Sequence, residues 1–75
     1  MHFDHELDVK GLSCPLPILR TKKALAKMNS GEVIRVFATD PNVIKDFQAF
    51  ARQTGNDLLS SHEQEHIFEL YLRRK

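Results

Sequence analysis

The residue best suited to chemistry is Cys14, the only cysteine of the chain, in the stretch GLSCPLPIL at residues 11–19. A cysteine thiolate is a nucleophile. One thiol can attack a donor's persulfide, keep the outer sulfur as Cys-SSH and give it up to the next thiolate, and this chemistry needs no catalytic triad. A single cysteine excludes a disulfide within one chain, so we expect a reducing compartment and a cytoplasmic protein.

Two prolines, Pro15 and Pro17, follow the thiol directly. Prolines at the first positions of a helix cost little, because the N–H groups there have no partner within the helix. We therefore predict a helix that begins at Pro15 or at Pro17, with Cys14 as its N-cap. The positive end of this helix and the nearby basic side chains should lower the pKa of the thiol. The alternative is that Cys14 is a small hydrophobic residue packed under the first turn.

Basic residues dominate the sequence around the thiol, although the formal net charge of the chain is only +1. No acidic residue lies between positions 10 and 31. We expect Arg20, Lys22 and Lys23 to steer and dock an acidic partner protein, the alternative being a solvated helix face. The basic residues of this stretch are Lys10, Arg20, Lys22, Lys23 and Lys27.

Two other classes of function stay open. In a thiol redox sensor or regulatory module, Cys14 would form a sulfenic acid or a mixed disulfide. An RNA-binding module would bind RNA in a salt-dependent way without the thiol. We expect no direct nucleic-acid binding, because the sequence offers no aromatic stacking platform beyond Phe37 and Tyr71.

The stretch HEQEH matches the zinc-protease pattern His-Glu-x-x-His, which works only when one helix presents both histidines. Here the stretch spans a predicted turn between two strands, so we expect His62 and His66 to be polar turn or edge residues. We expect His2 and His5 to lie in a mobile N-terminal segment. Cys14 has no paired-ligand spacing with the histidines, and we expect neither a metal site nor a cofactor.

The elements that must position these residues are predicted from hydrophobic periodicity and turn signals. Asp40 is expected to be the N-cap of the second helix, Pro41 its first residue and Gly55 its terminator. Asp46 is expected to be a surface charge on that helix. The expected elements are a strand at 5–10, a helix at 16–28, a strand at 32–39, a helix at 40–55, and a hairpin of two strands around a turn near residue 64.

These elements predict an α/β (α+β) fold of order βαβαββ. Right-handed crossovers place both helices on one face of a mixed four-stranded sheet, which gives a two-layer sandwich. We expect one domain over residues 1–75, because hydrophobic residues make up 41% of the chain and no linker is visible. No apolar stretch is long enough to span a membrane.

The sheet face without helices is expected to leave several apolar side chains partly exposed. This face would be a docking surface for partner proteins or simply a leftover apolar rim of a small domain. The side chains concerned are Val33, Phe37, Ile67 and Tyr71.

The stretches LDVKGLSCPLPIL and GEVIRVFATDPNVIKDF, followed by a hairpin, resemble the TusA family of small sulfur carriers. The mark of that family is the Cys-Pro-x-Pro motif at a helix start. The resemblance extends from about Glu6 to the end of the chain and includes the Leu-Asp pair, the glycine before the motif and the Asp-Pro pair of the second helix. It implies the fold order βαβαββ.

The resemblance also implies a persulfide relay in which Cys14 bears the sulfur while Gly11, Pro15 and Pro17 shape its loop. The donor would be a cysteine desulfurase or a rhodanese-type protein, and the acceptor a sulfurtransferase of the DsrE or TusD type. The carrier would be a monomer when free, and a transferase only in the sense that it is loaded and unloaded covalently. Family members feed tRNA wobble-uridine thiolation, molybdenum cofactor assembly and sulfur oxidation, and the residues do not choose among these routes.

Overall fold

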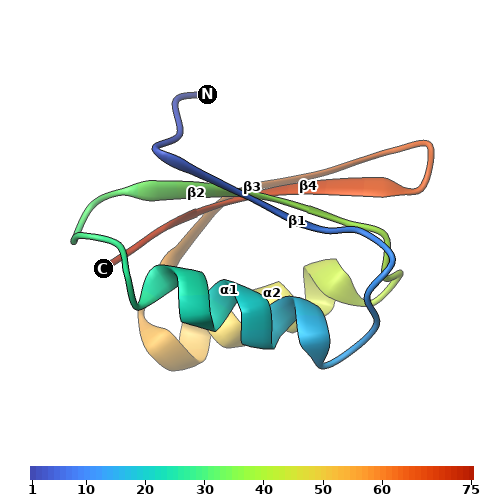
Figure 1. Ribbon diagram of the computed structural model, residues 1–75, viewed down its shortest axis with the longest axis horizontal. Coiled ribbons are helices and arrows are strands. Elements are labelled where there is room, and N and C mark those ends of the chain that lie inside the picture. Colours follow the sequence, from blue (N-terminus) through green and yellow to red (C-terminus); the bar gives the residue numbers. More distant parts are fainter.

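Two helices and four strands alternate along the chain in the order that the sequence predicts. A computed structural model describes residues 1–75 as β1 (His5–Val9), α1 (Leu16–Leu25), β2 (Val33–Ala38), α2 (Val43–Thr54), β3 (Asp57–Gln64) and β4 (Ile67–Arg73). The four strands form one sheet and both helices cover the same face of it (Figure 1). This confirms the predicted two-layer α/β sandwich. No helix of the chain is both long enough and apolar enough to cross a membrane.

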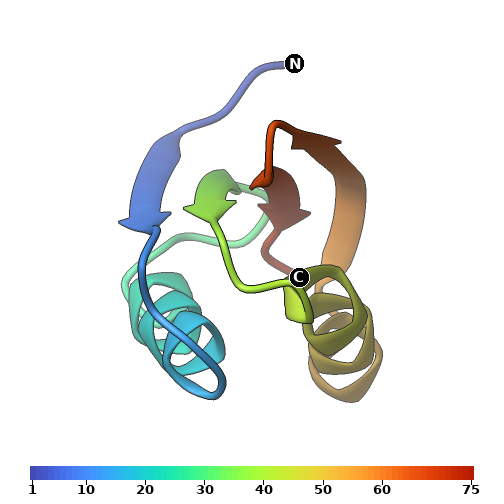
Figure 2. The ribbon, with the colours of Figure 1, turned by 90° about the vertical axis from the view of Figure 1, so that its right-hand side faces the viewer.

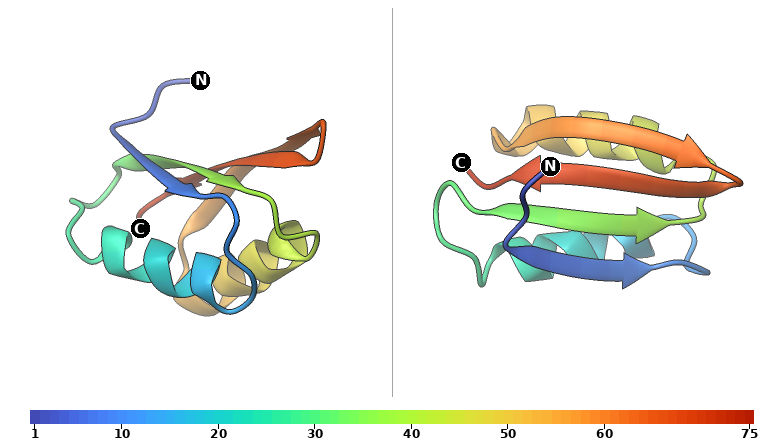
Figure 3. Two further views of the ribbon diagram at one scale, coloured as in Figure 1. Left: turned by 45° about the vertical axis from the view of Figure 1, so that its right-hand side comes forward. Right: turned by 90° about the horizontal axis from the view of Figure 1, so that it is seen from above.

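The sheet is mixed, with the strand order β1-β2-β4-β3 (Figure 3). β1 runs parallel to β2, with Val9 beside Ala38 at the end of the ladder, and the other neighbouring strands are antiparallel. Because β1 and β2 are parallel, their carboxyl ends lie at the same edge of the sheet. The loop that follows β1 and the link that follows β2 therefore meet at this edge, and the cysteine lies in that loop.

The core fills the space between the sheet and the two helices (Figure 2). The predicted alternation of β2 and β4 is confirmed, because every second residue of each strand is buried against the helices. α2 contributes two aromatic rings, Phe47 and Phe50, packed edge to face at 6.3 Å between centroids. The inward-facing residues of the two strands are Ile34, Val36, Ala38, Phe68, Leu70 and Leu72.

The N-cap and the C-terminal end of α1 differ from the prediction. The helix begins at Leu16, between the two predicted starts, and its N-cap is Pro15, so Cys14 is not the N-cap. It ends at Leu25 rather than Met28, although Met28 is buried in the core beyond it. Cys14 thus lies one residue farther from the helix end than the sequence suggests.

The start of α2 also lies later than predicted. Its first residue is Val43 and its N-cap is Asn42, so Asp40 and Pro41 precede the helix as part of the link from β2. The predicted terminator is confirmed: Gly55 has φ +80°, a conformation that favours glycine, and its N–H donates to the Ala51 carbonyl oxygen at 2.9 Å.

A tight turn joins β3 to β4. Its central residues, Glu65 and His66, both have positive φ (52° and 67°), as two-residue hairpin turns require. The stretch HEQEH therefore runs from an edge strand into a turn, as predicted. His62 lies in β3 and His66 in the turn, so no helix presents the pair.

The sheet face opposite the helices is more covered than predicted. Val33 and Tyr71 are buried, while Phe37 is half-buried and Ile67 is exposed. The N-terminal residues provide the cover, because the Phe3 ring packs on Tyr71 with 6.3 Å between centroids. The Arg35 guanidinium lies 4.5 Å from the centroid of the Phe37 ring and pairs with Glu6 and Glu69.

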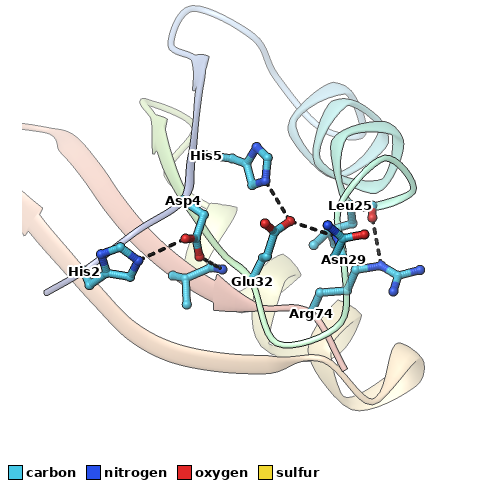
Figure 4. A network of polar contacts seen from close by, with 8 residues as sticks. His2, Asp4, His5, Leu25, Asn29, Glu32 and Arg74 are labelled. Carbon is cyan, nitrogen blue, oxygen red and sulfur yellow. Dashed lines mark hydrogen bonds and ion pairs between the residues drawn. The ribbon is translucent and has the colours of Figure 1, made fainter.

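Hydrogen bonds hold the N-terminal segment in place, so the predicted mobility of His2 and His5 is wrong. His5 belongs to β1, and its Nε2 lies 3.0 Å from the Glu32 carboxylate (Figure 4). His2 pairs with Asp4 at the same distance. Asp4 in turn exchanges hydrogen bonds with the backbone of Val33 through its own N–H and its Oδ2. The segment thus continues the sheet beyond β1.

Candidate functional site

Cys14 lies at the sheet edge where the carboxyl ends of β1 and β2 meet, and it is exposed and free. Two hydrogen bonds fasten its loop to the link after β2. The Gly11 N–H donates to Thr39 Oγ1 at 2.9 Å, and the Cys14 N–H donates to Asp40 Oδ2 at 3.0 Å. Gly11 has φ +82°, which favours glycine and turns the chain out of β1. The thiol is therefore displayed on a loop whose backbone is held at two points.

The two prolines lie at the start of α1 in different environments. Pro15 is exposed, and the peptide bond between Cys14 and Pro15 is cis. Pro17 is buried within the first turn, and its carbonyl oxygen accepts a hydrogen bond from Thr21 Oγ1 at 2.8 Å. Pro17 therefore anchors the first turn to the core, while Pro15 stays beside the thiol at the surface.

The start of α1 offers few N–H groups to the thiol. Pro15 and Pro17 have none. The N–H of Leu16 between them donates to the Ser13 carbonyl oxygen at 2.9 Å. The backbone amides that would stabilise a thiolate at an ordinary helix start are thus missing or already bonded next to Cys14.

The local charges also differ from the prediction. Desolvation raises the pKa of the Cys14 thiol above its usual value, and the Asp46 carboxylate raises it further. The charge of Asp40 acts in the same direction, and no cation is among the causes. The predicted lowering of this pKa is therefore wrong. The basic residues surround the cysteine in the sequence, whereas carboxylates surround it in space.

Asp40 and Asp46 are the residues that sequence reasoning missed as parts of this site. Asp40 is only 7% exposed, and its Oδ1 accepts the N–H of Asn42 at 3.1 Å while Oδ2 accepts that of Cys14. Asp46 lies in the first turn of α2 and is half-buried. Both were assigned roles within their own helix, because one sequence does not show which loop lies across from a helix start.

The three predicted docking residues do not form one surface. Arg20 and Lys23 line a groove between α1 and the edge strand β1, while Lys22 lines a different groove with Arg74 and Lys75. None of the three lies within 4.0 Å of a carboxylate, so their charges are available to a partner. The first groove is lined by Leu7, Arg20, Lys23, Ala24 and Lys27.

Apolar side chains accompany these charges on the surface of α1. Leu16 is 41% exposed and Leu19 is 52% exposed. Because they are three residues apart, they lie on the same side of the helix, at the end nearest Cys14. Apolar contacts next to unpaired charges are typical of surfaces that bind proteins transiently. The chain brings no group of three or more histidine, cysteine or acidic side chains into a metal-binding arrangement.

Comparison with known proteins places this site in a family. Residues 5–74 match the family described as Sulfurtransferase TusA. The chain is 56% identical over 72 residues to the sulfur carrier protein TusA of Allochromatium vinosum, an alignment that covers 96% of this chain and 95% of that protein. It is also 56% identical over 69 residues to a putative sulfur carrier protein of Neisseria meningitidis serogroup A, with 92% and 93% of the two chains covered.

A solved structure agrees with these matches. The crystal structure of a SirA-like protein from Desulfitobacterium hafniense superposes with a TM-score of 0.83 and 26% sequence identity, over 93% of this chain and 96% of that chain. The relatives cover nearly the whole chain, including the loop that carries Cys14. The chain therefore belongs to the TusA family.

Proposed function

We propose that this protein carries sulfur as a persulfide on Cys14. In the loading step, Cys14 Sγ attacks the outer sulfur of a donor persulfide; a new S–S bond forms while the donor's S–S bond breaks, and the donor leaves as a thiolate. In the unloading step, an acceptor thiolate attacks the outer sulfur of Cys14, which leaves as a thiolate in turn. The thiol proton goes to solvent during loading, and no external oxidant or reductant is needed.

The observation that carries this proposal is a single exposed cysteine at the sheet edge of a protein whose relatives are named sulfur carriers. Because Cys14 is exposed, a partner's cysteine can approach the thiol. Persulfide relay needs only one thiol per carrier, and this chain has one. The loop-shaping roles of Gly11, Pro15 and Pro17 belong to the same proposal.

The partners in this proposal are proteins. The donor is a cysteine desulfurase or a rhodanese-type protein, and the acceptor is a sulfurtransferase of the DsrE or TusD type, met by a monomeric carrier in the cytoplasm. Support for docking through α1 comes from its unpaired cations Arg20, Lys22 and Lys23 and from the exposed Leu16 and Leu19. The acceptor decides whether the sulfur enters tRNA thiolation, molybdenum cofactor assembly or sulfur oxidation.

Intact-protein mass spectrometry tests the proposal. After incubation with a cysteine desulfurase and free cysteine, the wild type should gain about 32 Da and lose it again on reduction. Cys14→Ser should gain nothing. This variant should also keep the stability of the wild type to within about 0.5 kcal/mol, because the replaced side chain is exposed.

The other outcomes separate the rival readings. Mass gains of sulfenic acid or of a mixed disulfide, without sulfane sulfur, would support a redox sensor instead. A thiol that stays unreactive toward alkylating agents under native conditions, together with strong destabilisation of Cys14→Ser, would mean that Cys14 is a packed residue. RNA binding that survives Cys14→Ser would point to the nucleic-acid class.

A further inference from the structure

Two consecutive residues of the link between β2 and α2 form hydrogen bonds with the loop that carries the thiol. Thr39 Oγ1 accepts the N–H of Gly11 at 2.9 Å, and Asp40 Oδ2 accepts the N–H of Cys14 at 3.0 Å. Each bond joins segments that are 28 or 26 residues apart in the sequence. We call this pair, Thr39 and Asp40, the clasp. It holds the loop at Gly11, near its start, and at the thiol-bearing residue itself.

Asp40 is built into the fold more firmly than a surface cap requires. It is 7% exposed, and both of its carboxylate oxygens accept backbone N–H groups, one from Cys14 and one from Asn42. Its carbonyl oxygen also accepts the N–H of Val43, the first residue of α2, at 3.0 Å. Asp40 thereby fixes the Cys14 backbone relative to the start of α2. This end of α2 is held in the core by the buried side chains of Val43 and Phe47.

We propose that Asp40, supported by Thr39, is a positioning residue for sulfur transfer, which fixes the Cys14 backbone so that Sγ is presented to the partner's persulfide in one orientation. The inference rests on the proposed carrier function. Transfer between two proteins requires the two sulfurs to meet in line, and a displacement of about 1 Å in such a geometry can cost about 100-fold in rate. The clasp reduces the freedom of a loop that has no other hydrogen bond to the link after β2.

The charge of Asp40 is unfavourable for a reactive thiol, so the contribution of this residue is to position the Cys14 backbone. A carboxylate close to a nucleophilic thiol opposes formation of the thiolate and raises the pKa of Cys14. For reactivity alone, an uncharged residue at position 40 would therefore be better. A carboxylate does what an amide does not, because both of its oxygens accept hydrogen bonds, and two N–H donors face it here.

Asp40→Asn tests this inference because it separates the two effects. The amide loses the charge and keeps only one accepting oxygen for two N–H donors. Alkylation of Cys14 by iodoacetamide near pH 7 should become faster than in the wild type, because more of the thiol is ionised. The maximal rate of loading by a desulfurase should fall by about tenfold or more, with little change in the KM for the desulfurase.

Two further variants are matched controls. Thr39→Val keeps the size of the side chain and removes the acceptor of the Gly11 N–H without changing any charge, so loading should slow while the pH dependence of alkylation stays that of the wild type. Asp46→Asn removes a charge that also raises the pKa of Cys14 but makes no hydrogen bond to the loop backbone. It should speed alkylation of Cys14 as Asp40→Asn does, so a loading rate that falls much more in Asp40→Asn than in Asp46→Asn separates the hydrogen bonds of Asp40 from its charge. Circular dichroism and thermal unfolding confirm that each variant is folded.

The outcomes are distinct from failure of the carrier function itself. A wild type that takes up no sulfur would reject the proposed function. A wild type that loads, together with an Asp40→Asn variant that is folded and loads as fast or faster, would overturn the positioning role and leave only an effect of charge. Slower loading with an unchanged alkylation profile in Thr39→Val would support the clasp independently of Asp40.

Discussion

The properties of Cys14 depend on its neighbours in space more than on its place near a helix start. Pro15 and Pro17 withhold two amides, the Leu16 N–H is bonded to Ser13, and the nearest charges are carboxylates. A raised pKa favours the protonated thiol, and protonated thiols react slowly with oxidants and electrophiles.

This arrangement predicts the pH dependence of thiol reactivity. Because the folded protein raises the pKa of Cys14, through desolvation first and Asp46 next, alkylation by iodoacetamide should reach half of its maximal rate at a higher pH than in a short peptide containing the same motif. Asp46→Asn should shift that midpoint toward the peptide value. The measurement is the alkylation rate from about pH 6 to pH 11, followed by mass spectrometry.

The peptide serves as the control because it has the prolines without the carboxylates. The unfolded chain ionises its cysteine at a lower pH than the folded one, so the contribution of this group to stability is fully present below the unfolded pKa and is lost as the pH rises through the folded pKa. If the pH of half-maximal alkylation in the folded protein were equal to or below that of the peptide, the raised pKa would be contradicted. The lowered thiol pKa that the sequence suggests would then be correct.

At the scale of elements, the sequence predicts those parts of the fold that depend on local pattern. The alternation in β2, the apolar line of α2 and the glycine at position 55 each specify their element without help from the rest of the chain. The start of α2 was misplaced because Asp40 has the sequence signature of a cap, whereas its side chain accepts the N–H groups of Asn42 and of Cys14. A capping pattern considers only the residues of one helix, so it does not predict a side chain that also bonds a distant loop.

In the candidate site, too, some residues can be predicted from local sequence and others depend on the tertiary fold. Cys14 and the motif around it are visible in the sequence, since a lone thiol followed by two prolines is unusual by itself. Asp46 is not visible as a partner of the thiol, because it enters the site from α2 through the tertiary fold. Likewise, the cations of α1 follow one another in the sequence but line two grooves on the helix, which only the packing of α1 against β1 and α2 reveals.

The grooves of α1 lead to a prediction about docking. The double variant Arg20→Glu/Lys23→Glu should slow sulfur loading by about tenfold at low salt, because it reverses two unpaired charges in one groove beside α1. The effect should shrink as salt is added. The measurement is the initial loading rate by a cysteine desulfurase at several ionic strengths, with thermal unfolding as a check on stability.

Lys27→Glu is the matched control for this groove. It makes the same kind of change in the same groove, but Lys27 lies two residues beyond the end of α1 and is farther from Cys14 along the chain than Arg20 and Lys23. Its effect on loading should therefore be smaller than that of Lys23→Glu. Equal rates for all variants at low salt would show that these charges only solvate the helix.

At the scale of the whole molecule, the thiol and the chain termini lie at opposite ends of the sheet. The loop of Cys14 follows the carboxyl ends of β1 and β2, whereas the network of His2, Asp4, His5 and Glu32 joins their amino ends to the loop after α1 (Figures 1 and 4). Changes in this network should therefore alter the stability of the fold and leave the thiol site intact. This separation gives a prediction about acid stability.

Two carboxylates of the network should make the fold sensitive to acid. Hydrogen bonds from the Val33 N–H and from His2 hold the pKa of Asp4 below its usual value, and those from the Asn29 N–H and from His5 do the same for Glu32. A lowered pKa means that the stability these groups contribute is present above their unfolded pKa values and is lost as the pH falls through the folded ones. Urea unfolding midpoints should therefore drop between about pH 5 and pH 2.

The double variant Asp4→Asn/Glu32→Gln separates these groups from the other acids of the chain. It should be less stable than the wild type near neutral pH and should lose less of its stability on acidification, so the two urea midpoints converge as the pH falls. Alkylation of Cys14 in this variant should follow the wild-type pH profile, because the changes are at the other end of the sheet. Parallel midpoint curves for the two proteins would show that Asp4 and Glu32 contribute nothing to acid stability, and an altered alkylation profile would show that the two ends of the sheet are coupled.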